Sequence, residues 1–146
     1  MQGARKIYES EADRDNEKSA IEDACHAWGC GYRKMPRSYR LDYYIFRPDG
    51  MALGFAEVKS RNFVWGKYPD IILSVSKAVA AVHLFDATGL SSRLIISADD
   101  RIMWCPFSSF LLDRDLVRWG GRTTNTRDNE DTEPVFHIPN KMFSEL

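Results

Sequence analysis

The segment from Tyr39 to Phe63 constrains the fold more than any other part of this chain. It reads YRLDYYIF, then RPDGMA, then LGFAEVKSRNF, so two runs rich in aromatic and branched residues flank a short turn sequence. Such runs favour β-strands, and Pro48 followed by Gly50 supplies the dihedral angles that a tight turn needs. The segment therefore predicts an antiparallel β-hairpin.

The register of this hairpin decides which side chains share a face. A two-residue or four-residue loop pairs Asp42 with Glu57 and Phe46 with Leu53. A three-residue loop with a bulge at Gly50 shifts the pairing by one residue, and a further bulge is then needed to return Asp42 to Glu57. The sequence leaves both registers open.

Glu57 and Lys59 place two opposite charges within the apolar second run. Residues two apart on a strand point to the same face. With Asp42 opposite Glu57, two carboxylates lie about 5 Å apart between Cβ atoms and repel each other unless a cation lies between them. Mg²⁺ prefers oxygen ligands and is often held by one or two carboxylates. We therefore predict a Mg²⁺ site at Asp42, Glu57 and the backbone carbonyl of Val58, where Mn²⁺ substitutes.

Lys59 would complete a reaction centre at this metal site. An ammonium group beside a metal-bound water can orient that water or offset negative charge that builds on a phosphate. Asp42, Glu57 and Lys59 are therefore candidate catalytic residues.

A helix is predicted over residues 8–28, where Glu17, Ile21 and Trp28 fall on one stripe. Glu17 occupies a position that packs against the sheet, and burying its carboxylate alone would cost several kcal/mol. The metal site and its lysine supply partners, so we expect Glu17 to be a further catalytic and metal-binding carboxylate. Glu22, rotated by about 100° from Ile21, is the alternative.

The other segments predict a mixed α+β chain. We expect a short strand at 30–36, a hairpin formed by 92–98 and 101–107, a short helix over 108–119, a loop over 120–134 and a last short strand at 135–139. A second helix is expected over 70–86, with an apolar line formed by Ile71, Val75, Ala78, Val82 and Phe85.

Composition limits the classes of protein to which the chain can belong. Its 146 residues, 44% of them hydrophobic, suffice for one compact core, so we expect a single domain over residues 1–146. The formal net charge of −1 excludes a globally basic nucleic-acid-binding protein. A local basic patch remains, since eight Lys and Arg residues outnumber three acidic ones between Arg33 and Lys67.

Targeting and cysteine chemistry add further expectations. No run approaches the roughly 18 apolar residues that span a bilayer, and the N-terminus lacks the apolar core of a signal peptide. We expect no membrane partner and a cytoplasmic location, in a bacterium or a phage-infected cell. Cys25, Cys30 and Cys105 do not have the usual spacing of a structural zinc site, so reduced, buried thiols are expected.

The order of these motifs resembles the PD-(D/E)XK nuclease superfamily. The similarity lies in a helix with DRDNEKSA, a strand with RLDYYIF and a strand with AEVKSR, followed by a helix and a strand. Matched residue by residue, the helix glutamate of the family falls on Glu17, its aspartate on Asp42, and its D/E-x-K signature on Glu57 and Lys59. Leu41 stands where the name-giving proline would be.

The resemblance implies an architecture as well as a site. It implies a restriction-endonuclease-like α/β (α+β) core over residues 8–98, with a mixed four- to five-stranded sheet flanked by helices in the order αβββαβ. Residues 99–146 would then form a C-terminal extension. DNA would be the partner of such a nuclease. Related nucleases often place a Ser or Lys of the second helix near the DNA. Together with the basic patch, this gives the candidate DNA-binding residues Arg33, Lys34, Arg37, Arg61, Lys67, Tyr68, Ser74 and Lys77.

The expected function is a Mg²⁺-dependent deoxyribonuclease, either an endonuclease or a resolvase-like phosphodiesterase, and cutting two strands would favour a homodimer. One alternative is a catalytically silent protein of the same fold that binds nucleic acid or inhibits a partner. Another is an interaction protein in which Glu57 and Lys59 form an exposed, silent ion pair. The sequence decides neither the shape of the substrate nor DNA against RNA.

Overall fold

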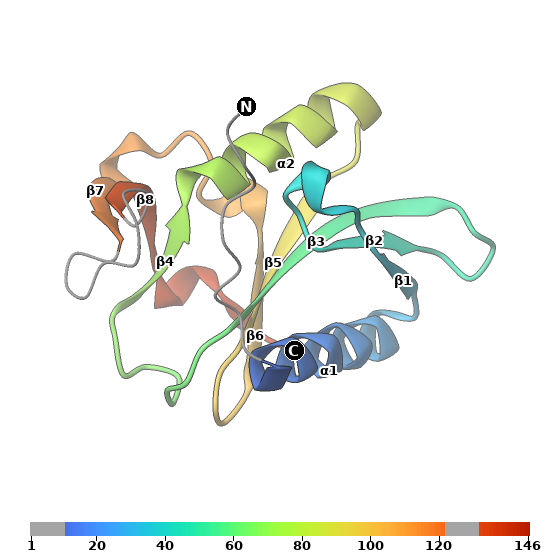
Figure 1. Cartoon of the computed structure of the whole chain (residues 1–146), viewed down its shortest axis with the longest axis horizontal. Coiled ribbons are helices and arrows are strands. Elements are labelled where there is room, and N and C mark those ends of the chain that lie inside the picture. The colour runs from blue at the N-terminus through green and yellow to red at the C-terminus, as the bar shows by residue number, and fades with distance from the viewer. Residues whose placement is uncertain (1–10, 122–131) are drawn as a thin grey trace.

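The computed structural model describes residues 11–121 and 132–146. Figure 1 shows how the elements are arranged. The helices are α1 (Glu11–Trp28) and α2 (Val75–Thr88). The strands are β1 (Gly31–Lys34), β2 (Tyr43–Phe46), β3 (Ala52–Ser60), β4 (Asp70–Ser74), β5 (Ser92–Ser97), β6 (Ile102–Pro106), β7 (Val117–Gly121), β8 (Thr132–Pro139) and β9 (Ser144–Glu145). Short 3₁₀ turns are η1 (Arg37–Tyr39), η2 (Phe107–Ser109), η3 (Arg114–Leu116) and η4 (Asn140–Met142).

Within the described ranges the strands form two sheets. The larger has the order β1-β2-β3-β5-β6-β9 and is mixed, because β3 and β5 are parallel while the other neighbours are antiparallel. The smaller sheet, β4-β8-β7, is antiparallel. Helix α1 covers one face of the larger sheet, and α2 with the smaller sheet covers the other (Figure 1). The predicted mixed sheet flanked by helices is confirmed, although it has more strands than the four to five expected.

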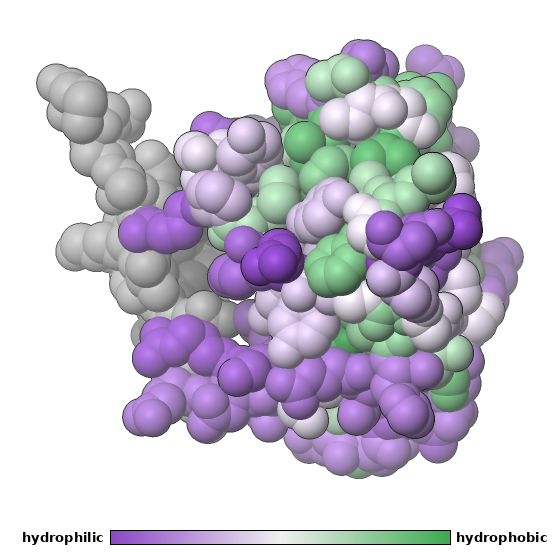
Figure 2. Space-filling model, turned by 90° about the vertical axis from the view of Figure 1, so that its right-hand side faces the viewer, coloured by the Kyte–Doolittle hydropathy of each residue, from purple (hydrophilic) through white to green (hydrophobic). Residues whose placement is uncertain are grey.

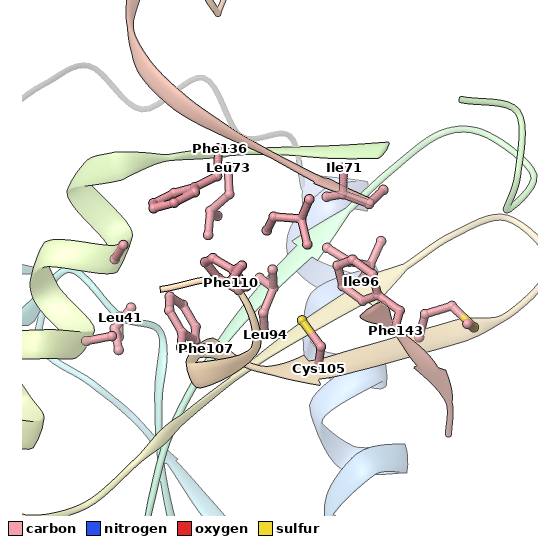
Figure 3. Close-up of a cluster of buried hydrophobic side chains, with 14 of the residues drawn as sticks. Leu41, Ile71, Leu73, Leu94, Ile96, Cys105, Phe107, Phe110, Phe136 and Phe143 are labelled. Carbon is pink, nitrogen blue, oxygen red and sulfur yellow. The ribbon is translucent and has the colours of Figure 1, made fainter. Parts of the chain in front are cut away.

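The central strand β5 contributes to the hydrophobic core on both of its faces. Ile95 packs with α1 in one buried cluster, whereas Leu94 and Ile96 belong to a second cluster with α2 and the smaller sheet. Figure 3 shows the second cluster, in which aromatic rings from Phe107 to Phe143 fill the space between the two sheets. The three consecutive apolar residues of β5, Leu94 to Ile96, are typical of a strand that is buried on both faces.

Helix α1 is amphipathic, as its sequence predicts. Ala20, Ile21, Ala24 and Cys25 are buried against the sheet. The opposite face of the helix is polar, and Figure 2 shows hydrophilic residues gathered along the lower side of the molecule, where α1 runs. This helix therefore packs on the sheet through small and branched side chains and leaves its charges at the surface.

The β2–β3 hairpin combines both registers that the sequence leaves open. Next to the turn, Phe46 pairs with Ala52, the shifted register, and Gly50 has a positive φ of 90°. The register then changes between Ile45 and Phe46, so that Tyr43 pairs with Ala56. The pairing of Phe46 with Leu53, which the two-residue or four-residue loop would give, does not form, because the chain makes the three-residue turn and a further bulge restores the other register.

Residues 70–74 form strand β4 rather than the start of the second helix. Ile71 is buried whereas Ile72 is 43% exposed, which is the alternation of a strand, and the whole segment pairs with β8. The helix begins only at Val75, after Ser74 caps it. The prediction was wrong because the pairing partner lies far away in the sequence, and the order αβββαβ gains this extra strand.

The buried side of α2 also differs from the predicted apolar line. Ala78, Ala80 and Ala81 are buried, whereas Val82 and Phe85 are 37% and 54% exposed. Small side chains let a helix approach its neighbours closely, and the larger ones then remain outside the contact. The line of large apolar residues was therefore the wrong guide to the packed face beyond Ala78.

The C-terminal part departs furthest from the predictions. Residues 108–119 were expected to be helical but form short 3₁₀ turns and the start of β7, and Leu112 has a left-handed φ of 67° that an α-helix does not allow. Most of the loop predicted over 120–134 lies outside the described residues, and its two ends belong to β7 and β8. The strand at 135–139 is confirmed within β8, but β9 follows it.

Candidate active site

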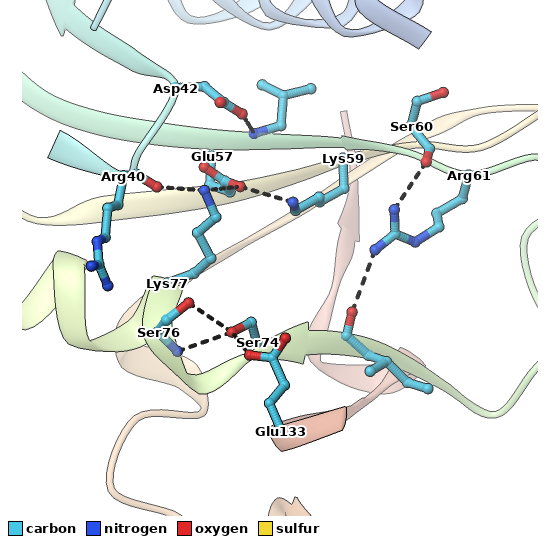
Figure 4. Close-up of polar contacts among 12 residues, drawn as sticks. Arg40, Asp42, Glu57, Lys59, Ser60, Arg61, Ser74, Ser76, Lys77 and Glu133 are labelled. Atoms are coloured by element: carbon cyan, nitrogen blue, oxygen red, sulfur yellow. Dashed lines mark hydrogen bonds and ion pairs between the residues drawn. The ribbon is translucent and has the colours of Figure 1, made fainter. Parts of the chain in front are cut away.

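The hairpin and α2 together bring the predicted charged residues to one side of β3 (Figure 4). Side chains alternate along β3, so Ala56 and Val58 pack in the cluster beneath α1, whereas Phe55 packs in the opposite cluster. Glu57 therefore points to the same side as Phe55. Its side chain is only 1% exposed, which excludes the interpretation of Glu57 as part of an exposed ion pair.

Two ammonium groups hold the buried Glu57 carboxylate. Oε2 of Glu57 lies 3.2 Å from Nζ of Lys59 and 3.2 Å from Nζ of Lys77. The pKa of Glu57 is raised, mainly because burial disfavours the charged carboxylate. The ammonium groups of Lys59 and Lys77 lower this pKa, and the negative charge of Asp42 raises it. Both carboxylate oxygens are buried, and neither accepts a hydrogen bond from the described residues, so the two lysines act on Glu57 as ion-pair partners.

Asp42 lies just before β2, where continuing the register by one residue places it opposite Glu57. One carboxylate oxygen accepts a hydrogen bond from the Val58 N–H at 3.0 Å, and the other lies 3.5 Å from Nζ of Lys34. The Asp42 side chain is 21% exposed, so it is more accessible than Glu57. The two carboxylates thus differ in solvation, and the proposed role of the Val58 carbonyl as a metal ligand stays a prediction.

Lys77 was predicted as a DNA contact, but the structure places it inside this cluster. It comes from the first turn of α2, and its Nζ donates to the Arg40 carbonyl at 2.5 Å besides its contact with Glu57. A signal was present in the sequence, because Lys77 is the only charged residue of α2 before Asp86. A lone cation on a helix with a packed face indicates a buried partner.

Arg61 connects α1 with the charged cluster. Its guanidinium donates to the carbonyls of Ser60 at 3.0 Å and Ile72 at 3.4 Å, which joins β3 to β4. Burial lowers the pKa of Arg61, and the carboxylates of Glu17 and Glu57 are the main influences that oppose the shift. This half-buried side chain therefore has internal partners and differs from the exposed cations of the basic patch.

Between the two helix carboxylates considered, the geometry favours Glu17. Glu17 is half-buried and lies in the charge environment of Arg61. Glu22 is exposed and accepts a hydrogen bond from the Tyr32 hydroxyl at 3.0 Å, on another side of the helix. Contact between Glu17 and a metal stays a prediction.

Several of the predicted DNA-binding residues are exposed. Arg33 and Lys34 lie on β1, Arg37 lies in η1, and Lys67 and Tyr68 lie in the loop between β3 and β4. Lys34 and Lys67 also lie over the rings of Tyr43 and Tyr68, at 4.9 and 5.5 Å from the ring centroids. These cations keep their charges at the surface, as phosphate contacts require.

Ser74 is engaged in the local structure of α2. Its hydroxyl accepts a hydrogen bond from the Ser76 N–H at 3.1 Å and donates one to Glu133 of β8. The carboxylate of Glu133 beside the helix start disfavours a phosphate at that position. This arrangement argues against the predicted DNA contact at Ser74.

The donor set of the cluster fits a divalent cation only in part. No group of three or more His, Cys, Asp or Glu side chains among residues 11–121 and 132–146 is arranged to hold a metal ion. Asp42 and Glu57 remain as a pair of carboxylates, and Glu57 Oε1 is a buried oxygen that lacks a donor within those ranges. A hard cation would satisfy that oxygen, and water would complete its coordination.

The cysteines behave as packed thiols. Cys25, Cys30 and Cys105 are free, and burial raises the pKa of Cys25 and of Cys105 to about 12. Such thiols stay protonated at neutral pH. The expectation of reduced cysteines agrees with this description, although Cys30 is only half-buried.

Comparisons with known proteins place this arrangement in a family. The family described as "Phage putative PDDEXK endonuclease" matches the chain over residues 3–146. The chain belongs to this family. A solved structure at 1.6 Å resolution, Hjc from Archaeoglobus fulgidus, a Holliday junction resolvase from an archaeal hyperthermophile, is similar in fold. Its TM-score is 0.52 at 12% sequence identity, and the match covers 88% of this chain and 87% of that chain.

Two further findings concern this PD-(D/E)XK chain. The search of curated proteins gives no match. Across the two described ranges, neither helix has the length and apolar character needed to cross a bilayer. The resemblance stated from the sequence and the restriction-endonuclease-like fold are confirmed.

Proposed function

We propose that this protein is a divalent-metal-dependent endonuclease that hydrolyses DNA phosphodiester bonds at Asp42, Glu57 and Lys59. The supporting observation is the buried Glu57 carboxylate, which two ammonium groups approach through Oε2 while neither of its oxygens accepts a hydrogen bond from the described residues. A carboxylate buried at this cost, paired with cations from two different elements, supports its assignment to a functional site. Membership of a PD-(D/E)XK family supports the same chemistry.

Asp42 and Glu57 would hold the cation, with Glu17 and the Val58 carbonyl as further proposed ligands. We propose Mg²⁺ as the physiological ion, with Mn²⁺ as a substitute, because hard oxygen ligands suit both. When bound, the ion would polarise a phosphate oxygen and acidify a nearby water. The hydrogen bond from the Val58 N–H to Asp42 keeps that carboxylate turned toward β3.

Lys59 would act on the phosphate during hydrolysis. The reaction joins a water oxygen to phosphorus and breaks one P–O ester bond, while a proton from the water ends on the leaving oxygen. Negative charge builds on the phosphate in this step, and the Lys59 ammonium would offset it. Glu57 holds Lys59 in place, because the two side chains pair at 3.2 Å.

DNA would be bound by exposed cations of β1, η1 and the loop between β3 and β4. Arg33, Arg37 and Lys67 are exposed, and their charges are available to phosphates. Replacing Arg33 and Arg37 together with glutamine should lower the slope of log affinity against log salt by about 2, since each lost phosphate contact contributes about 0.9. Fluorescence anisotropy with a labelled duplex measures this slope, and an unchanged slope would mean that these cations face away from the DNA.

The decisive experiment is a cleavage assay with labelled DNA, in Mg²⁺, in Mn²⁺ and with a chelator. The wild-type protein should cut only with a divalent ion, and Asp42→Asn should cut at least about 100-fold more slowly. Asp23→Asn, a matched change at an exposed position on α1, should cut at the wild-type rate. DNA binding without cleavage in any of these conditions would instead support the catalytically silent binding protein.

The substrate and the oligomeric state form a finer part of the proposal. The similar fold of Hjc, a Holliday junction resolvase, suggests that a four-way junction be compared with a duplex of the same sequence. We propose a resolvase-like preference for the junction and a homodimer, since cutting two strands needs two sites. Equal rates on both substrates would contradict the preference, and a monomer in analytical ultracentrifugation would contradict the dimer.

A further inference from the structure

Glu57 has more positive charge beside it than one carboxylate needs. Nζ of Lys59 and Nζ of Lys77 both lie 3.2 Å from the same oxygen, Oε2. Lys59 is two residues away on the same strand, so its pairing with Glu57 follows from β3 alone. Lys77 comes from α2, and its presence depends on how that helix packs. One ammonium is enough to pair with Glu57, so the second is available for another task.

The contacts of Lys77 leave its side chain partly accessible to solvent. Besides Glu57, its Nζ donates to the backbone carbonyl of Arg40, and its side chain is 23% exposed. Arg40 has a positive φ of 66°, a conformation that a residue with a side chain seldom adopts and that persists where the surrounding structure requires it. The Arg40 carbonyl thus places Lys77 between η1 and β3, within the charged cluster of Figure 4.

A cation and DNA would both change this arrangement. Both ammonium groups lie against Oε2 of Glu57, whose side chain is only 1% exposed, so they occupy one of the two oxygens with which this carboxylate would hold a divalent cation. Lys59 is tied to the strand that carries Glu57. Lys77 has a flexible four-carbon stem from a different element, and a lysine ammonium binds phosphate as a point charge.

We propose that Lys77 is a phosphate-binding residue of the active site that rests on Glu57 until metal and DNA arrive. This inference rests on the proposed function. In the resting protein Lys77 opposes a divalent cation at Glu57, and in the complex with DNA it turns to a phosphate beside the site.

The proposal predicts opposite effects on two affinities. Removing the charge of Lys77 removes a competitor for Glu57, so metal should bind more tightly in the absence of DNA. The same change removes a phosphate contact, so DNA should bind more weakly in the presence of metal. A lysine that only stabilised the fold would weaken both affinities when replaced.

The test uses the full chain and four proteins: the wild type, Lys77→Gln, Lys77→Arg and Lys141→Gln. Lys141 is an exposed lysine of η4, so its replacement controls for the loss of one positive charge. Calorimetric titration with Mn²⁺ alone should show about tenfold tighter binding for Lys77→Gln. Anisotropy with a labelled DNA duplex in Ca²⁺ should show about tenfold weaker binding for the same variant. Lys77→Arg should keep DNA affinity near that of the wild type, because it keeps the charge.

The outcomes separate this inference from the proposed function. If Lys77→Gln binds both Mn²⁺ and DNA as the wild type does, or binds both more weakly, the inference is wrong while the nuclease proposal stands. If neither the wild type nor Lys77→Gln binds Mn²⁺, with or without DNA, the proposed function is contradicted and the inference with it. Thermal unfolding of each variant checks that the fold is intact, and if Lys77→Gln does not fold, loss of DNA affinity in the folded Lys77→Arg variant contradicts the inference.

Discussion

The two faces of the larger sheet differ in what they bury. Between the sheet and α1, the cluster contains apolar side chains such as Ile21, Val58 and Ile95. On the opposite face, β3 buries the charged side chain of Glu57, close to apolar residues such as Phe55 and Leu94 that are also buried there. The difference arises from the covering elements, since α1 presents small and branched apolar side chains while α2 presents Lys77. A buried carboxylate persists where a neighbouring element supplies a cation, so both faces bury apolar side chains that stabilise the fold, and only the face toward α2 also buries the carboxylate that we propose for the chemistry.

Replacing Glu57 with glutamine should have the largest effect on cleavage of the changes considered. Glu57→Gln keeps the shape of the side chain and removes its charge, so the divalent ion and Lys59 lose their partner. We expect cleavage to fall by about 1000-fold while circular dichroism stays unchanged. A variant that cuts DNA at the wild-type rate would show that Glu57 is a structural residue.

Truncation on the α1 face should have the reverse effect. Ile95 is fully buried in the cluster beneath α1, so Ile95→Ala should lower the free energy of unfolding by about 2 to 5 kcal/mol. Cleavage per folded molecule should stay at the wild-type level at a temperature where the variant is folded. Urea unfolding measures the first quantity, and a loss of cleavage in folded Ile95→Ala would mean that the two faces are coupled.

The helix carboxylate tests whether α1 also contributes to the chemistry. Glu17→Gln should lower cleavage by about tenfold, because Glu17 lies near Arg61 and is a proposed ligand. The matched change Glu22→Gln should leave cleavage unaltered, since Glu22 contacts Tyr32 at the surface. If neither change lowers cleavage, α1 contributes to packing alone and the site has two carboxylates.

The pH dependence of stability should be the smallest of these effects. Burial raises the pKa of Glu57 above its usual value of 4.5, so the folded protein holds that proton more tightly than the unfolded chain. Ionisation of Glu57 therefore costs stability as pH rises from 4.5 through the raised pKa. Glu57→Gln lacks this cost, so in metal-free buffer its stability relative to the wild type should increase over that pH range. Urea unfolding at several pH values checks this, and a constant difference would contradict it.

The charged pair on β3 was predictable because it follows from local rules. Alternation along a strand places Glu57 and Lys59 on one side, and the turn sequence limits the pairing of Asp42 to two registers. The structure has the register of the three-residue loop at Phe46 and that of the two-residue or four-residue loop from Ile45 onward, and no local pattern decides where the change occurs.

Strand β4 and the position of Lys77 were not predictable in the same way. Residues 70–74 fit a helical apolar line as well as a strand, and β8 decides between them by pairing with the whole segment. Likewise, Lys77 reaches Glu57 because the alanines of α2 pack against the core, while the larger Val82 and Phe85 remain exposed. Both outcomes depend on contacts between distant segments.

Local sequence was enough to predict the hairpin, the amphipathic first helix and the chemical character of Asp42, Glu57 and Lys59. These features depend on backbone propensity and side-chain alternation over a few residues. Only the tertiary structure decided that Glu57 is buried and that a second lysine meets it. Burial and ion pairing take their free energy from elements that meet only in the folded chain, so no short stretch of sequence encodes them.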